Sequence, residues 1–233
     1  MSRVVLVTGG TRGIGRALAE ALLKAGDTVA VTGTTEDGVV KVERELSHFG
    51  QAIAIACDVR DSAAAERAVR TVIAKFGRLD VLVNNAGVGV GAPVADLTHD
   101  EWNRIIGTNL TGIFNCCKAA IPQLRQGGGG WIVNVSSLAS KNPFPGGAAY
   151  CASKAAVNAF SEALMQELRY DNIRVTYVLP GSVATGFSGR EPESGAEWKL
   201  LPEDVAHAIV DALNHPARSL PSRIEIRPST PKK

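Results

Sequence analysis

Short apolar segments alternate with segments of helical periodicity along almost the whole chain, and this alternation narrows the possible folds more than any other feature. Residues 3–8 are the first apolar run, and in residues 14–25 the apolar side chains recur every three or four positions, as on one face of a helix. Strands that are apolar throughout are typical of parallel sheets that helices cover on both faces. The alternation therefore predicts an α/β chain with a mostly parallel sheet between two layers of helices.

Right-handed crossovers between such strands give a doubly wound, or Rossmann, fold, in which ligands bind at the carboxyl ends of the strands. The sequence has no break in composition and no internal repeat, so we expect residues 1–233 to form a single domain. About seven strands are expected, of which the later ones are residues 28–32, 52–57, 80–83, 131–135, 173–178 and, at an edge, 223–227. The later helices are expected at residues 39–49, 101–120, 149–169 and 202–213, with one more that begins at Asp61 or Ser62 and ends at about residue 75. Thr98 and Glu101 form a capping box that opens the helix 101–120.

The composition and charge give no reason to expect a nucleic acid, a membrane or a metal ion as partner. The 233 residues carry a net charge of +2, which gives no reason to expect a nucleic acid or a membrane surface as partner. No apolar run approaches the roughly 18 residues of a transmembrane helix, and we expect no signal peptide. The four cysteines fit no zinc or CxxC spacing, and the four histidines are scattered. We therefore expect no metal site, and reduced thiols in a cytoplasmic protein.

Two glycine-containing turns follow predicted strands. The first, Thr8-Gly-Gly-Thr-Arg-Gly-Ile-Gly15, lies between a strand and a helix, where backbone amides and the positive end of the helix dipole can meet a pyrophosphate. It lacks the Gly-Lys-Ser/Thr of a phosphate loop, which argues against an NTPase. The second, Asn84-Asn-Ala-Gly87, can hold two strand ends together and leave room for a ribose. We predict a dinucleotide-binding site, with plain tight turns as the alternative.

The end of the second predicted strand bears on which dinucleotide binds. A carboxylate there would bind the 2′-hydroxyl of the adenosine ribose and repel a 2′-phosphate, but the sequence has Gly33 and Thr34, and its first acid is Glu36. Thr34 offers a hydroxyl, and Arg12 offers a cation that can pair with phosphate. We expect NADP(H) rather than NAD(H), and Gly33→Asp to reverse that preference. The alternative is that Arg12 is a solvated loop charge and that the site accepts either cofactor.

A tyrosine, a lysine and a serine form the candidate catalytic group. Tyr150 and Lys154 are four residues apart and so share one helix face, while Ser137 follows the fifth predicted strand at the carboxyl edge of the sheet. A free tyrosine titrates near pH ~10, and a neighbouring ammonium would lower that pKa toward the range useful for acid–base catalysis. Ser137 could donate to a substrate oxygen or orient it. The alternative is a chance Tyr-x-x-x-Lys pair with a surface lysine.

The chain resembles the short-chain dehydrogenase/reductase family over about residues 4–185. Four motifs occur in the order typical of that family: TGGTRGIG, NNAG, a serine thirteen residues before a tyrosine, and YCASK. The resemblance implies hydride transfer that reduces a ketone or 3-oxoacyl carbonyl to an alcohol. It implies that Asn109 joins Ser137, Tyr150 and Lys154 in a catalytic tetrad and holds a water in a proton relay. It also implies cofactor contacts at Gly9, Thr11, Arg12, Gly13, Ile14, Gly15, Thr34, Asp58, Val59, Asn85, Ala86, Gly87, Tyr150, Lys154, Pro180, Gly181, Val183 and Thr185.

Within the family, the chain is similar to bacterial NADPH-dependent 3-oxoacyl-acyl-carrier-protein reductases and related carbonyl reductases. That similarity implies a small-molecule or acyl thioester carbonyl substrate, and Arg12 and Thr34 match the 2′-phosphate contacts of such reductases. Their glycine-rich tail is replaced here by residues 224–233, so the similarity does not by itself imply an acyl-carrier substrate or the tetramer interface that the usual tail builds. Family members pair helices equivalent to 101–120 and 149–169, which implies a homodimer or homotetramer.

Residues 186–200 are glycine-rich and polar, with Phe187 and Trp198 as apolar anchors, and they predict a lid over the substrate. Two other functions are open to a chain with these features. A non-catalytic dinucleotide-binding sensor or scaffold would be favoured by loss of the serine, tyrosine or lysine, but all three are present. An epimerase on the same fold would have a longer substrate region than the one that follows Thr185.

Overall fold

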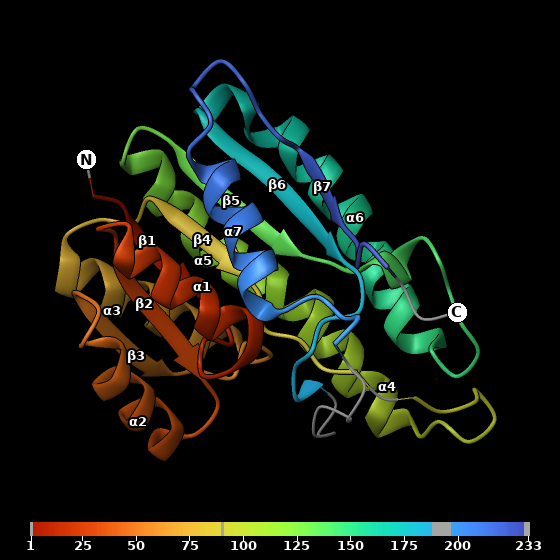
Figure 1. Ribbon diagram of the computed structural model, residues 1–233. Helices are drawn as coiled ribbons and strands as arrows, with labels where there is room; N and C mark the ends of the chain where they lie inside the picture. The colour runs from red at the N-terminus through yellow and green to blue at the C-terminus, as the bar shows by residue number, and fades with distance from the viewer. Residues whose placement is uncertain (1, 90, 188–196, 231–233) are drawn as a thin grey trace.

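A computed structural model describes residues 2–89, 91–187 and 197–230 (Figure 1). Seven parallel strands form one sheet in the order β3-β2-β1-β4-β5-β6-β7. The strands are β1 (Val4–Val7), β2 (Thr28–Gly33), β3 (Ala52–Ala56), β4 (Val81–Asn84), β5 (Gly130–Val135), β6 (Ile173–Pro180) and β7 (Arg223–Ile226). The chain runs from β1 outward to β3, then returns to β4 beside β1, so the strand order reverses there. This confirms the predicted doubly wound α/β fold.

Helices cover both faces of the sheet (Figure 1). They are α1 (Gly13–Lys24), α2 (Glu36–Leu46), α3 (Ser62–Phe76), α4 (His99–Ile106), α5 (Gly112–Gln126), α6 (Ala148–Leu168) and α7 (Pro202–Leu213). The buried side chains of α3, α5 and α6 belong to one hydrophobic core, and those of α1, α2 and α7 to another. Among the described residues, no helix has the length and apolar composition needed to cross a bilayer.

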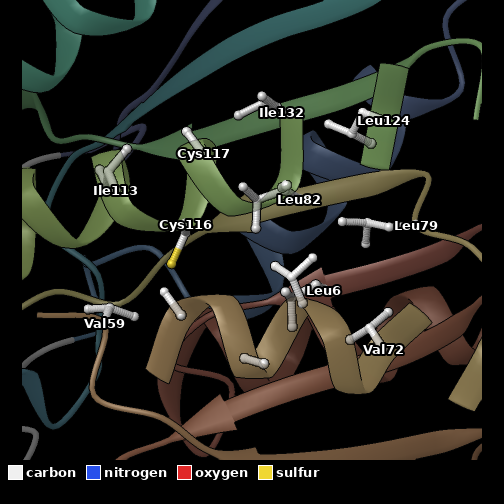
Figure 2. Close-up of a cluster of buried hydrophobic side chains, with 14 of the residues drawn as sticks. Leu6, Val59, Val72, Leu79, Leu82, Ile113, Cys116, Cys117, Leu124 and Ile132 are labelled. Atoms are coloured by element: carbon white, nitrogen blue, oxygen red, sulfur yellow. The ribbon is translucent and has the colours of Figure 1, made fainter. Parts of the chain in front are cut away.

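Alternation along each central strand fills the two cores. In β1, Leu6 faces the core with α3 and α5, whereas Val5 and Val7 face the core with α1 and α7. Figure 2 shows Leu6 and Leu82 between the strands and the helices α3 and α5 of the first core. Because consecutive side chains of a strand point to opposite faces, a strand buried on both faces has to be apolar throughout. This is the physical reason for the continuous apolar runs in the sequence.

Two helices differ from their predicted bounds. The helix α2 spans Glu36–Leu46 rather than residues 39–49. It begins earlier because the side chain of Thr35 caps it by accepting a hydrogen bond from the Gly38 amide. In place of the predicted helix 101–120, the chain forms α4 from His99, a π-helical segment η1 (Gly107–Thr111) and α5, which continues to Gln126. The capping box that opens α4 is confirmed, with Thr98 and Glu101 each accepting from the other's backbone amide.

Candidate active site

The glycine-rich turn follows β1 at the point where the strand order reverses. Gly9 and Gly13 have φ angles of +65° and +56°, in the left-handed region that favours glycine. A Cβ atom at Gly9 would lie 2.9 Å from the Cα of Ala86, and one at Gly15 would overlap the Gly9 carbonyl. The three glycines of the turn thus form a cradle of bare backbone at the amino end of α1. Such a cradle fits the pyrophosphate of a dinucleotide, because side chains at these positions would keep the pyrophosphate away from the backbone amides.

Asn85 joins the turn after β4 to the glycine-rich turn. Its Nδ2 donates to the carbonyl oxygens of Thr8 and Gly9, at 3.0 Å each, and its backbone amide donates to the Thr8 hydroxyl. The amide of Ala86 donates to the same hydroxyl at 3.1 Å. The structure therefore holds the carboxyl ends of β1 and β4 together, as the sequence predicts for the Asn-Asn-Ala-Gly turn.

A series of hydrogen bonds between buried polar side chains begins at Asn84, the last residue of β4. Asn84 Nδ2 donates to Asn134 Oδ1 at 2.8 Å, and Asn134 Nδ2 donates to Ser161 Oγ at 2.9 Å. These bonds link β4, β5 and α6. Asn84 Oδ1 is buried and has no hydrogen-bond partner in the described part of the chain. Sequence reasoning did not identify Asn134 or Ser161, because neither stands out without knowledge of which strands and helices are neighbours.

Tyr150 and Lys154 lie one turn apart on α6, as their spacing predicts. The Lys154 side chain is buried, with its residue only 4% exposed, and its Nζ donates to the carbonyl oxygen of Val135 at 2.8 Å. The same Nζ lies 5.9 Å from the centre of the Tyr150 ring. Ser137 follows β5 at the carboxyl edge of the sheet and begins a short 3₁₀ turn, where its Oγ accepts from the Ala139 amide. The three side chains therefore meet at one edge.

Burial controls the titration of this pair. It lowers the pKa of Lys154 to about 8, because an ammonium loses solvation inside the protein. It also raises the pKa of Tyr150, since a phenolate is disfavoured there, and the Ser137 hydroxyl opposes this as a hydrogen-bond partner. The pKa of Tyr150 is therefore raised rather than lowered as expected, and the charge of Lys154 is not among the causes of the shift. Tyr150 consequently holds its proton at neutral pH.

Asn109 lies in the π-helical segment and is completely buried. Its Oδ1 accepts from the Val88 amide at 2.8 Å, and its Nδ2 donates to the Val88 carbonyl at 2.9 Å and to Ser153 Oγ at 3.0 Å. A Cβ atom at Gly87 would lie 3.4 Å from Asn109 Oδ1 and 3.7 Å from Lys154 Nζ, so both atoms border the same glycine. The side chain of Asn109 is fixed by three hydrogen bonds beside the lysine.

Further polar residues support Ser137 and were missed by the sequence reasoning. Ser136 Oγ donates to Asn158 Oδ1 at 2.6 Å, and Asn158 Nδ2 donates to Ser140 Oγ at 2.8 Å. Ser140 Oγ in turn donates to the Ser137 carbonyl at 2.6 Å. Asn158 lies four residues after Lys154, so the helix spacing that pairs Tyr150 with Lys154 could also have identified it.

Two of the predicted cofactor contacts, Asp58 and Val59, lie in the loop after β3. Both carboxylate oxygens of Asp58 accept from the Arg60 guanidinium, which holds the pKa of that carboxyl below its usual range. Val59 is buried, and its carbonyl accepts from Asn115 Nδ2 at 2.9 Å. Thr34 is exposed at the end of β2. Arg60 was not predicted, although its place two residues after Asp58 allows the pairing.

The segment after β6 lies against the glycine-rich turn. Arg12 donates to the Gly186 carbonyl at 3.2 Å, and a Cβ atom at Gly13 would lie 3.3 Å from Thr185 Cγ2. Pro180 ends β6, the Gly181 amide donates to the Ile226 carbonyl, and Val183 forms a parallel bridge with Leu200. These contacts place the two predicted cofactor-binding segments on the same side of the sheet edge.

Part of the predicted lid is described. Phe187 is 40% exposed, and its ring centre lies 5.8 Å from that of Tyr150, with the ring planes at 60°. Residues 188–196 of the predicted lid lie outside the described residues. An apolar ring therefore borders the candidate catalytic tyrosine at the start of this segment.

Comparison with known proteins agrees with this geometry. The sequence profile of the short chain dehydrogenase family matches residues 3–194. The chain is 35% identical to sulfoacetaldehyde reductase 2 of Chromohalobacter salexigens, covering 98% of this chain and 95% of the relative. An alcohol dehydrogenase of Thermococcus sibiricus, solved with 5-hydroxy-NADP, superposes with a TM-score of 0.92 at 28% identity and 100% coverage of both chains.

A 3-ketoacyl-(acyl-carrier-protein) reductase of Brucella melitensis, solved with NADH, superposes with a TM-score of 0.89 at 28% identity, covering 97% of each chain. The family match spans most of this chain, and the sulfoacetaldehyde reductase matches over nearly its whole length. The chain therefore belongs to the short-chain dehydrogenase family of oxidoreductases.

Proposed function

We propose that the chain is an NADP(H)-dependent carbonyl reductase that interconverts a ketone or 3-oxoacyl carbonyl and the corresponding alcohol, with Tyr150 as the acid–base. The observation that carries the proposal is the meeting of Tyr150, Lys154 and Ser137 beside the glycine cradle at one sheet edge. A non-catalytic dinucleotide sensor would have no need for a buried lysine next to a tyrosine that holds its proton.

The described residues fit a nicotinamide dinucleotide. The amides at the start of α1, with Gly13 and Gly15, would hold the pyrophosphate, and Asp58 and Val59 would border the adenine. The turn from Asn85 to Gly87 would leave room for the nicotinamide ribose, and Lys154 would bind that ribose. Residues 180–185 would pack on the nicotinamide. The bound cofactor supplies or accepts the hydride.

The protein's own groups manage the proton. Ser137 donates to the substrate oxygen and orients it toward Tyr150. Tyr150, which holds its proton at neutral pH, then gives that proton to the substrate oxygen. Lys154 stabilises the phenolate that remains, and Asn109 holds the water through which a proton returns. Fixing these groups before the substrate arrives avoids the cost of ordering them during the reaction.

The proposed substrate is a class of compounds, namely carbonyl compounds and the corresponding alcohols. Proteins similar to this chain are a sulfoacetaldehyde reductase, an alcohol dehydrogenase and a 3-ketoacyl-(acyl-carrier-protein) reductase. All three names describe carbonyl or alcohol chemistry, and they differ in the group attached to the carbonyl. NADPH absorbance followed with 3-oxoacyl thioesters, diketones, short aldehydes and, with NADP⁺, hydroxy acids tests the proposal. We expect consumption with at least one carbonyl, whereas NADPH that binds and is never consumed would favour the sensor.

We expect NADPH to be preferred over NADH by at least about tenfold in kcat/KM, a difference of roughly 1.4 kcal/mol. The reason is the cation of Arg12 and the absence of a carboxylate at Gly33 and Thr34. Arg12→Ala should weaken the binding of NADPH more than the binding of NADH. Arg70→Ala is the matched control, since Arg70 is an exposed residue of α3. A wild-type preference for NADH would refute the assignment.

We propose a homodimer or homotetramer built on α5 and α6. Phe114 is 48% exposed on α5, and Ala155 and Ala159 are exposed on α6. Light scattering at micromolar concentration should give two or four subunits. Ala159→Arg should shift the protein toward the monomer, while Ala74→Arg on the exposed face of α3 should not. A wild-type monomer would contradict the proposal.

The proposed location is the cytoplasm, where thiols stay reduced. All four cysteines are free and buried. Burial raises the pKa of Cys57 to about 11 and that of Cys117 to about 12, so both thiols remain protonated and unreactive. Cys116 and Cys117 lie in the first hydrophobic core (Figure 2), where Cys117 Sγ also accepts from Asn84 Nδ2 at 3.3 Å.

A further inference from the structure

The glycine-rich turn is bound to the end of β2. The Gly10 amide donates to the Thr32 carbonyl at 2.9 Å, and the Gly9 amide donates to the Thr32 hydroxyl at 3.2 Å. This places Thr11 directly beside Gly33, the last residue of β2. A Cβ atom at Gly33 would lie 2.5 Å from Thr11 Cγ2 and 3.1 Å from Val39 Cγ1.

The contact with Thr11 is the severe one. Carbon atoms pack at about 3.5–4.0 Å, so a separation of 2.5 Å requires Thr11 to move. Threonine has two heavy atoms on its Cβ, and therefore only one of its three staggered rotamers turns a hydrogen toward Gly33. The contact with Val39 needs a shift of only a few tenths of an ångström. With threonine at position 11, a side chain at position 33 therefore requires Thr11 to rotate or shift.

We infer that Thr11 determines cofactor specificity through this methyl group, which keeps a carboxylate out of the position where it would bind the 2′-hydroxyl of NAD(H). The inference rests on the proposed function, because it assumes a dinucleotide along this edge. A carboxylate at the end of β2, about 20 residues beyond the glycine turn, is the usual partner of that hydroxyl. Gly33→Asp alone is therefore expected to damage the protein rather than reverse its preference.

The steric part is tested on the protein without cofactor. Gly33→Ala should lower Tm by roughly 2–10 °C, the effect of overpacking in a protein of this size. Adding Thr11→Ser, which removes only the methyl group, should restore at least half of that loss. Gly91→Ala is the matched control, because a Cβ atom there meets no described atom within 4 Å. A Gly33→Ala protein as stable as wild type, or no recovery with Thr11→Ser, would overturn the inference.

The specificity part compares Kd and kcat/KM for NADPH and NADH in Gly33→Asp and in Thr11→Ser/Gly33→Asp. The double variant should shift the preference toward NADH at least about tenfold further than Gly33→Asp, about 1.4 kcal/mol of coupling. The Thr11→Ser variant alone should still prefer NADPH over NADH, since it adds no carboxylate. Equal preferences in the two Asp variants would overturn the inference. A wild-type preference for NADH would refute the proposed cofactor and leave the Tm result unaffected.

Discussion

Tyr150→Phe should lower turnover by ~10²–10⁴-fold, the range typical of general acid–base catalysis. The substitution removes one oxygen and keeps the ring, so the packing against Phe187 should remain. What is lost is the proton donor beside the substrate oxygen. NADPH affinity should change little, and a fluorescence titration of NADPH measures it separately from the rate.

The control for this variant is Tyr170→Phe. Tyr170 is 91% exposed, so the loss of its hydroxyl should leave turnover unchanged. In wild type the reductive rate should fall as pH rises, because the raised pKa of Tyr150 marks the pH range in which the proton is lost. The apparent pKa belongs to Tyr150 and Lys154 together. Near-normal turnover of Tyr150→Phe on a chemistry-limited substrate would show that Tyr150 is not the acid–base.

Lys154→Met should lower both the rate and the affinity for NADPH. Methionine fills a similar volume but removes the ammonium, whose pKa burial lowers to about 8, and leaves the Val135 carbonyl without its 2.8 Å donor. The phenolate of Tyr150 would then lack its neighbouring cation, and the nicotinamide ribose would lack a hydrogen-bond donor. We expect at least about tenfold loss in each quantity, or roughly 1.4 kcal/mol.

The dissociation constant of NADPH separates the two active-site variants, because only Lys154→Met should raise it. Lys24→Met, at the end of α1, is the control, since Lys24 is exposed and lies over the Phe49 ring at 4.8 Å. A Lys154→Met protein that binds NADPH and turns over like wild type would contradict both roles of the lysine.

Features set by neighbouring residues could be predicted from the sequence. The capping box of Thr98 and Glu101 and the pairing of Tyr150 with Lys154 depend on spacings of three and four residues, and the structure shows both arrangements. The strands followed from continuous apolar runs, which a sheet covered on both faces requires. The start of α2 at Glu36 was missed because apolar periodicity begins later than the cap at Thr35.

Features set by distant residues could not be predicted. The π-helical segment holds Asn109, whose side chain binds the backbone of Val88, twenty-one residues earlier. The methyl group of Thr11 restricts Gly33 only because the glycine turn is bound to β2. The direction of the Tyr150 pKa shift likewise depends on burial, which arises only when α6 packs on the sheet edge.

The most direct test of the proposed function is transfer of deuterium from the transferring C4 position of labelled NADPH to a carbonyl substrate in a single turnover. Mass spectrometry of the alcohol shows where the label goes. We expect one deuterium on the former carbonyl carbon with wild-type protein, and the same product formed far more slowly with Tyr150→Phe. An alcohol without deuterium, or NADPH bound tightly and consumed with no carbonyl of the panel, would contradict the proposed function.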